Sequence, residues 1–146
     1  MMERGLEAAE NLLMMSIIRS AGIVAALAAA ASSPSLAQDA GAGERVYAQC
    51  RACHQIGEGA RNIVGPQLNG LFGRKAGTVE GYTYSAANKN SGLTWDDATF
   101  RDYIKDPRAK IPGTKMVYAG LKDEQRITDL IAYLKQFDAT GKKAAP

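Results

Sequence analysis

Apolar side chains recur at helical spacing near the C-terminus. They lie at positions i, i+3, i+4 and i+7, namely Ile127, Leu130, Ile131 and Leu134. This spacing places them on one face of an amphipathic helix. The helix dipole favours acidic residues at the start of a helix and basic residues at its end. We therefore predict a helix that begins at the acidic residues 123–124 and ends near Lys135.

A shorter pattern of the same kind precedes it. Its apolar positions are Phe100, Tyr103 and Ile104. Thr94 is the predicted N-cap, with the acidic residues 96–97 in the first turn. This helix must end near Asp106, because Pro107 disfavours a helical conformation in the residue before it.

The remaining pattern predicts two further helical segments and long loops. A first helix is expected over residues 41–54, and a short helical turn over residues 85–90. Residues 55–81 contain seven glycines, which favours loops over regular elements. The polar segment 138–146 is expected to be frayed. No stretch alternates as a strand does, so we expect an all-α fold of about four to five helices.

Residues 1–37 are interpreted as a signal peptide. Arg19 precedes the apolar run 21–31, and Ser35-Leu36-Ala37 matches a signal-peptidase site. A bilayer about 30 Å thick requires about 20 apolar residues to span it, and the run 21–31 is shorter than that. An uncleaved membrane tether is therefore the less favoured alternative. Acidic residues outnumber basic ones in residues 1–13, which indicates an over-extended start. The expected mature domain is residues 38–146, exported to the periplasm.

The charge balance indicates the kind of partner. The chain has 18 Lys plus Arg, 15 Asp plus Glu and a formal net charge of +3. A modest positive charge favours encounters with acidic protein surfaces. The basic residues are scattered and no nucleic-acid-binding motif is present, so we expect no nucleic-acid partner.

The segment Cys50-Arg51-Ala52-Cys53-His54 contains both cysteines and the only histidine of the chain. Cys-x-x-Cys-His is the spacing of a c-type haem attachment site. On a helix these three side chains share one face, so two thiols can form thioethers with the haem vinyl groups while the imidazole reaches the iron. A structural zinc site needs four such ligands, a thioredoxin-like site needs a βαβ context, and a disulfide leaves the histidine unexplained.

Met116 is the candidate for the second iron ligand. The other four methionines lie in the predicted leader, and Met116 follows a proline and a glycine in the loop 111–116. The alternative is a methionine that fills a gap in the core. A Met/His pair raises the reduction potential, as suits an electron carrier. With its one histidine used as a ligand, the protein lacks the usual general base, so we expect no enzymatic activity. A haem peroxidase or a ligand-binding protein with a labile sixth ligand remains the alternative.

The chain resembles class I cytochrome c, both the mitochondrial type and the bacterial cytochrome c2 type, over nearly all of residues 41–137. The matching blocks are residues 50–54, Gly65-Pro66-Gln67-Leu68-Asn69-Gly70-Leu71-Phe72-Gly73-Arg74-Lys75, Tyr82-Thr83-Tyr84-Ser85-Ala86-Ala87-Asn88-Lys89-Asn90, Leu93-Thr94-Trp95, residues 111–116 and residues 129–135. The order and spacing of these blocks make the resemblance specific. It implies a small helical fold wrapped around one covalently bound haem.

The resemblance also implies roles for single residues. The Pro66 carbonyl would hold His54, as partners of metal-bound histidines do. Tyr84, Trp95 and Arg74 would lie near a buried haem propionate. Tyr103, Asn88 and Thr114 would surround Met116, with Tyr118 at the exposed haem edge. Gly43 and Tyr47 would cross the last helix at Leu130 and Tyr133. Core packing is the alternative for the aromatic residues, and a solvated surface charge for Arg74.

The function implied is that of a soluble monomeric electron carrier. The implied donor is a cytochrome bc1 complex, and the acceptor a terminal oxidase or photosynthetic reaction centre. A periplasmic dehydrogenase is the alternative donor. The basic ring of the mitochondrial proteins is only partly present. It is matched by Lys115, Lys122 and the conservative Arg108, whereas its usual lysines are replaced by Gln49, Ile63, Ala109 and Asp123.

Overall fold

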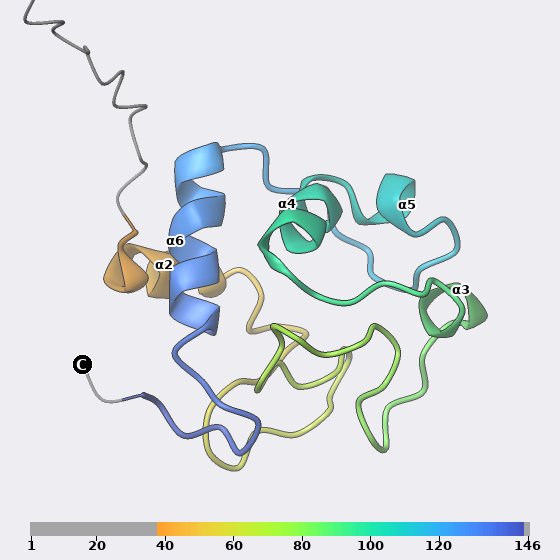
Figure 1. Cartoon of the computed structure of the whole chain (residues 1–146), viewed down its shortest axis with the longest axis horizontal. Coiled ribbons are helices and arrows are strands. Elements are labelled where there is room, and N and C mark those ends of the chain that lie inside the picture. The colour runs from red at the N-terminus through yellow and green to blue at the C-terminus, as the bar shows by residue number, and fades with distance from the viewer. Residues whose placement is uncertain (1–37, 145–146) are drawn as a thin grey trace, which may run out of the picture. The chain divides into compact units, whose positions relative to one another are not determined.

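The computed structural model describes residues 38–144, which form five helices joined by long loops (Figure 1). In chain order these are α2 (Ala40–Tyr47), α3 (Ala86–Lys89), α4 (Asp97–Lys105), α5 (Pro107–Lys110) and α6 (Glu124–Leu134). Within residues 38–144 the only extended pairings are two isolated bridges, Lys75–Thr94 and Phe137–Lys143. The expected all-α fold is confirmed.

Helices α2 and α6 lie side by side in Figure 1 and pack in close contact. Gly43 of α2 makes this possible, because a Cβ atom on it would lie 1.9 Å from the carbonyl oxygen of Asp129. Tyr47 continues the contact, with its ring centroid 5.3 Å from that of Tyr133. The sequence correctly placed Gly43 and Tyr47 at the crossing. The closest approach is to the Asp129 backbone, one residue before Leu130.

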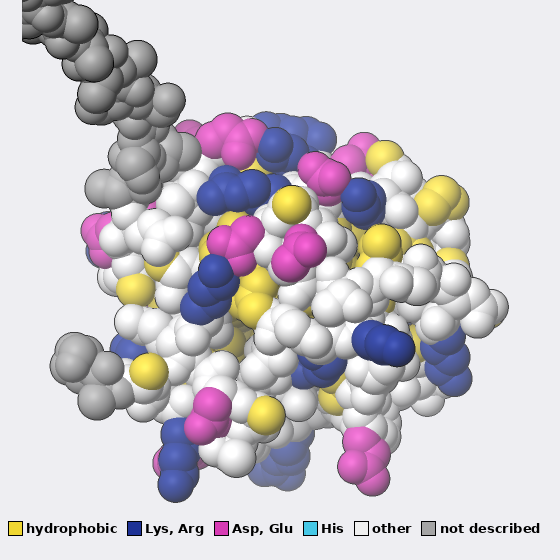
Figure 2. All heavy atoms as spheres, viewed as in Figure 1, with side chains coloured by type: hydrophobic (Ala, Val, Ile, Leu, Met, Phe, Trp, Pro, Cys, Tyr) yellow, Lys and Arg dark blue, Asp and Glu magenta, His cyan; other side chains and the backbone are white. Residues whose placement is uncertain are grey.

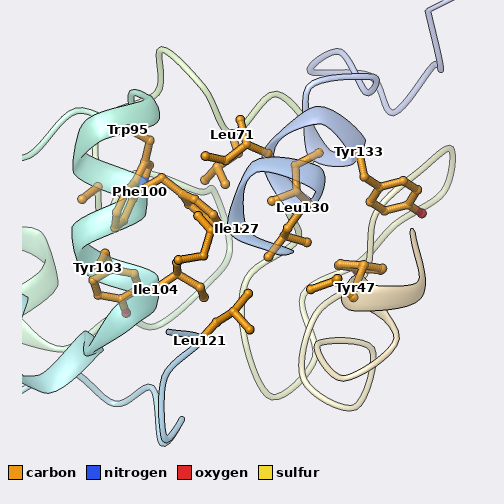
Figure 3. Packing of buried hydrophobic residues seen from close by; sticks show 14 of the residues in the cluster. Tyr47, Leu71, Trp95, Phe100, Tyr103, Ile104, Leu121, Ile127, Leu130 and Tyr133 are labelled. Atoms are coloured by element: carbon orange, nitrogen blue, oxygen red, sulfur yellow. The ribbon is translucent and has the colours of Figure 1, made fainter. Parts of the chain in front are cut away.

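The buried core centres on α6, with side chains of both α2 and α4 packed in the same cluster (Figure 3). Ile127 and Ile131 of α6 are fully buried, as the apolar stripe predicted. Figure 3 shows Ile104 of α4 extending toward Ile127. Burying one such side chain contributes about 1.5–3 kcal/mol to stability. The predicted apolar faces of both helices are therefore the faces that meet.

Ion pairs join the outer faces of the same two helices. They are Lys135–Asp97 at 2.6 Å, Arg101–Glu124 at 3.4 Å, and Lys105–Glu124. Figure 2 shows acidic and basic side chains interspersed on this face. Such exposed pairs contribute about 0–1 kcal/mol each. The packing of apolar side chains therefore dominates the α4–α6 contact.

The prediction for the first helix is partly wrong. Helix α2 ends at Tyr47, and residues 48–53 form successive turns. Gln49 N–H donates to the Val46 oxygen and Cys50 N–H to the Tyr47 oxygen, which are i→i+3 bonds that tighten the end of a helix. The haem-binding motif therefore lies on turns that follow the helix.

The predicted start of α4 is also wrong. Its N-cap is Asp96, whose side chain accepts a hydrogen bond from Thr99 N–H at 2.7 Å. Thr94 instead lies in the bridge with Lys75. Asp and Thr are both common N-caps, so the residue type could not decide between them. The helix ends at Lys105, as Pro107 predicted.

Helices α3 and α5 are the two shortest helices of the described residues. Helix α5 was not predicted; Asp106 caps it and Pro107 occupies its first turn, a position that suits proline. The short helix α3 lies within the predicted helical turn over residues 85–90, and Ser85 is its N-cap and Asn90 its C-cap.

The expectation of a frayed tail is wrong for residues 138–144. The Asp138 carboxylate accepts hydrogen bonds from the backbone N–H groups of Thr140 and Lys142. Ala144 N–H donates to the Gln136 oxygen at 2.7 Å. The signal peptide, its cleavage site and the suspected start all lie in residues 1–37, outside the described residues. In residues 38–144, no helix has the length and apolar character to cross a membrane.

Candidate haem site

The turns after α2 bring the Cys-x-x-Cys-His motif to one cavity. Cys53 N–H and His54 N–H both donate to the Cys50 oxygen, at 3.0 and 2.9 Å, so the motif forms one helical turn. Cys50, Cys53 and His54 all line the same cavity, and neither cysteine forms a disulfide. Tyr47 holds the end of this turn by donating its hydroxyl to the His54 oxygen at 2.9 Å.

Pro66 orients the imidazole of His54. The Nδ1 atom lies 2.7 Å from the Pro66 carbonyl oxygen. A carbonyl can only accept, so Nδ1 carries the proton and Nε2 keeps its lone pair. Burial lowers the pKa of His54, although the bond to Pro66 acts in the opposite direction. His54 is thus a neutral imidazole with one nitrogen able to bind a metal.

Gly65 allows the loop to pass across this ring. A Cβ atom at Gly65 would lie 2.4 Å from the imidazole Cε1 atom, closer than two carbon atoms can approach. Any larger residue would displace His54 or the loop. The sequence placed Gly65 in a matching block without giving it a role, and the signal that marks it is its position directly before Pro66.

The cavity is large and mostly apolar. Its volume is about 280 Å³, whereas protein interiors have few voids larger than a water molecule. Much of its apolar wall comes from the loop after the motif, from α4 and from α6, and this part includes Leu68, Leu71, Phe100, Ile104, Leu130 and Leu134. The sequence identified several of these leucines as part of a matching block or helix face and not as part of a site.

Met116 also lines this cavity and is held by polar neighbours. The Tyr103 hydroxyl donates to the Met116 sulfur at 3.3 Å and lies 3.3 Å from the Thr114 hydroxyl. Met116 N–H also donates to the Thr114 hydroxyl. Burial raises the pKa of Tyr103, so its hydroxyl remains a donor at neutral pH. Asn88 lines the cavity too, with its side chain 3.3 Å from the Ser85 hydroxyl.

Arg74 and Trp95 are brought together by backbone pairing. Trp95 N–H donates to the Arg74 oxygen at 2.9 Å, and Gly73 N–H donates to the Trp95 oxygen at 2.7 Å. Both side chains line the cavity, as does that of Tyr84. The Trp95 ring also packs against the ring of Tyr103, with centroids 4.9 Å apart.

The Arg74 guanidinium has an unsatisfied donor. Its two terminal nitrogens donate to the carbonyl oxygens of Asn69, at 2.7 Å, and Gln67, at 3.4 Å. Its Nε atom is buried and has no hydrogen-bond partner in residues 38–144. Burial lowers the pKa of Arg74. Because burying an unmatched charge is costly, this site fits an anionic group.

These side chains together fit a covalently bound haem. Two thiols and a neutral imidazole line an apolar cavity that also contains a thioether and a buried guanidinium nitrogen with no partner among the described residues. These groups match the vinyl, iron and propionate positions of haem c. The zinc alternative fails, because no group of three or more His, Cys, Asp or Glu side chains in the described structure could hold a metal ion.

One supporting residue has a role that the sequence did not reveal. Asn69 joins two parts of the loop that follows the motif. Its side-chain amide accepts a hydrogen bond from Gly57 N–H at 2.8 Å and donates one to the Gly57 oxygen at 2.9 Å. The same residue supplies a carbonyl oxygen to Arg74. Such a clamp joins positions 12 apart in sequence, and no local pattern marks that pairing.

The comparisons with known sequences point to one family. Residues 40–138 match the family model described as cytochrome c. The chain is 64% identical to cytochrome c2 of Blastochloris viridis over 115 residues, which cover 79% of this chain and 91% of that protein. It is 62% identical over 103 residues to cytochrome c-550 of Bradyrhizobium diazoefficiens, covering 70% of this chain and 76% of that protein.

Solved structures give the same result. The fold is similar to that of cytochrome cH from Methylobacterium extorquens, with a TM-score of 0.62 and 50% identity, over 66% of this chain and 97% of that chain. It is also similar to cytochrome c2 from Rhodospirillum centenum, with a TM-score of 0.66 and 40% identity, over 68% of this chain and 98% of that chain.

Proposed function

Because the chain belongs to the cytochrome c family and is a monohaem electron carrier, we propose that His54 and Met116 would hold its iron as the two protein ligands. The haem c is attached through Cys50 and Cys53, and when bound it supplies one-electron chemistry between Fe(II) and Fe(III). The proposal assigns to this chain's residues the tasks of holding the two ligands, excluding water and presenting one edge of the site to a partner.

The observation that carries the proposal is that both candidate ligand side chains line one cavity and that each makes a hydrogen bond that holds it in place. Pro66 fixes the imidazole of His54 through Nδ1, which leaves Nε2 for the metal. Tyr103 donates to the Met116 sulfur, which withdraws electron density from it. A thioether already favours the reduced state, and this hydrogen bond strengthens that preference.

Two protein ligands on the iron would leave no position for a substrate, which supports electron transfer and not catalysis. Family members are electron carriers, and we propose that this chain has no enzymatic activity of its own. A peroxidase or ligand-binding haem protein needs an open sixth position, which Met116 would fill. The single histidine is committed to the iron, so it cannot serve as a general base.

Replacing the proposed sulfur ligand tests this assignment. The ferric holoprotein should show the far-red band of Met-to-Fe(III) charge transfer. Met116→Ala should abolish the band, lower the reduction potential and allow exogenous ligands to bind. Val117→Ala is the matched control, because Val117 is 82% exposed beside the same ligand and should retain the band. Wild-type protein that lacks the band and reacts readily with peroxide would favour the enzyme.

We propose a cytochrome bc1 complex as the donor and a terminal oxidase or photosynthetic reaction centre as the acceptor, with the protein acting as a monomer. The support is the resemblance to cytochrome c2 and the modest positive charge. A periplasmic dehydrogenase is the alternative donor. Reduction by purified bc1 complex, compared with reduction by a candidate dehydrogenase, distinguishes the two donors. Sedimentation of the holoprotein tests the monomer.

We also propose that residues 1–37 are a leader removed during export and that residues 38–146 form the periplasmic carrier. The support is the Ser35-Leu36-Ala37 pattern after an apolar run. Mass spectrometry of periplasmic holoprotein should find an N-terminus at Gln38. A chain recovered from membranes that still begins at Met14 or Met15 would establish the tethered alternative.

A further inference from the structure

We propose that Gln49 and Tyr118 form a latch that holds the Met116 loop closed over the haem cavity. The Tyr118 hydroxyl donates a hydrogen bond to the Gln49 side-chain oxygen at 3.0 Å, although the two residues are 69 positions apart. The proposal goes beyond the assignment of Met116 as a ligand and rests on it, since it concerns how that ligand is kept in place.

The latch joins the two segments that bind the haem. Gln49 directly precedes Cys50, and Tyr118 lies two residues after Met116. Both Gln49 and Tyr118 line the cavity. Their hydrogen bond therefore connects the attachment segment to the ligand loop without passing through the haem.

The ligand loop needs such a connection, because its backbone is weakly held. Residues 115–120 make no backbone–backbone hydrogen bond within the described structure; such bonding resumes at Leu121, whose N–H donates to the Ile104 oxygen. Besides the bond from Tyr103 to the Met116 sulfur, two side chains connect this segment to more distant parts of the chain. Lys115 Nζ donates to the Thr83 oxygen at 3.0 Å, and Tyr118 donates to Gln49.

The latch lies where solvent reaches the cavity. Val117, between Met116 and Tyr118, is 82% exposed, and Val64 on the other wall is 71% exposed; both line the cavity. A loop that opened here would release Met116 and admit a ligand to the iron. The latch therefore adds to the barrier that excludes external ligands.

The structure also supplies a matched control. Tyr82 donates its hydroxyl to the Val64 oxygen at 2.9 Å, on the wall that leads to Gly65 and His54. This bond has the same chemistry as the Tyr118 bond but does not hold the Met116 loop. Tyr82→Phe therefore tests whether any loss of a tyrosine hydroxyl at the mouth has the same effect.

The experiment uses the ferric holoprotein with imidazole as the external ligand. The variants are Tyr118→Phe, Gln49→Ala, the double variant and Tyr82→Phe. Tyr118→Phe keeps the aromatic ring and removes only the donor. From the net stabilisation that one hydrogen bond contributes, we expect each latch variant to bind imidazole about two- to tenfold more tightly than the wild type. Because both changes remove the same bond, the double variant should equal the stronger single variant.

Tyr82→Phe should bind imidazole as the wild type does. The latch is refuted if Tyr118→Phe binds imidazole like the wild type, if the effects of the two single variants multiply in the double variant, or if Tyr82→Phe has the same effect. The charge-transfer band of the ligand-free protein separates the two proposals. Its presence in wild type and variants supports Met116 as ligand whatever the imidazole result, and its absence from wild type overturns the ligand assignment and the latch with it.

Discussion

Tyr103 donates its hydroxyl to the sulfur of Met116 across 3.3 Å, and the same oxygen lies 3.3 Å from the hydroxyl of Thr114. A thioether sulfur is a weak acceptor, so it can accept this bond and still bind a metal, although the bond lowers the electron density on the sulfur. Burial raises the pKa of Tyr103 above its ordinary value of 10. The hydroxyl therefore remains protonated, and the bond persists, over the whole neutral range.

Tyr103→Phe should lower the reduction potential of the holoprotein. Loss of the hydrogen bond returns electron density to the sulfur, which then stabilises Fe(III) better. A bond worth about 0.5–1.5 kcal/mol corresponds to about 20–60 mV for a one-electron couple. Spectroelectrochemical titration measures the change. Tyr133→Phe, whose ring packs on Tyr47 away from the cavity, should leave the potential nearly unchanged, and a raised potential in Tyr103→Phe would contradict this role.

The attachment of the haem can be tested chemically. Cys50 and Cys53 provide two thioethers, so extraction with acidified acetone should leave the haem on the polypeptide. Cys53→Ala should retain at most one thioether and unfold at a lower denaturant concentration, because a domain of this size buries too little surface to lose part of a covalent core lightly. Haem that extracts freely from wild-type protein would refute covalent attachment.

Gly43→Ala should destabilise the fold. Its Cβ would lie 1.9 Å from the Asp129 oxygen and 2.7 Å from the Tyr133 Cβ, and relief of this overlap would force α2 and α6 apart. We expect a loss of at least about 2 kcal/mol in the free energy of unfolding, measured by denaturant titration.

Gly41→Ala in the same helix is the control for that loss. A Cβ at Gly41 would meet only a side-chain oxygen of Asp39, at 3.2 Å. Alanine also has a higher helix propensity than glycine, so this variant should be as stable as wild type or slightly more stable. Equal destabilisation by both variants would show that the close approach of the helices is unimportant.

The parts of the fold that the sequence predicted are those decided by packing. The stripe through Ile127 and Leu130 is buried because hydrophobic burial dominates the stability of a helix, and the spacing of such residues is visible in the sequence. The ends of the elements depend on competing local hydrogen bonds. Thr94 and Asp96 are both able to cap α4, and only the pairing of Thr94 with Lys75 decides between them.

In the candidate site, too, the sequence predicted which residues line the cavity but not every hydrogen bond that they make. The resemblance brought Arg74 to the cavity, and the structure agrees with that placement. It gave no indication that the carbonyl oxygens of Asn69 and Gln67 would satisfy two of its nitrogens and leave Nε free. That result depends on the path of a glycine-rich loop through positive-φ positions such as Gly70. Sequence patterns with a period of 2 or 3.6 residues do not describe such a path.

The last prediction concerns the docking surface. Lys115 is an exposed residue beside Met116 at the mouth of the cavity, and Lys143 is exposed in the tail. If an acidic partner docks at the mouth, Lys115→Glu should slow electron transfer more than Lys143→Glu does. Transfer by the wild type should also slow as salt rises, because the Debye length falls from about 30 Å at 0.01 M to about 10 Å at 0.1 M.

Lys115 also makes a hydrogen bond, and the experiment must separate the loss of this bond from the change of charge. Its Nζ atom donates to the Thr83 oxygen at 3.0 Å, so Lys115→Glu removes a tether of the ligand loop as well as a positive charge. Lys115→Ala removes the same hydrogen bond without adding a negative charge. If docking depends on charge, Lys115→Ala should slow transfer at low salt less than Lys115→Glu, and the difference between them should shrink at high salt. Stopped-flow kinetics with the purified acceptor measures both effects. Equal slowing by Lys115→Glu and Lys143→Glu at low salt would mean that partners do not dock at the mouth of the cavity.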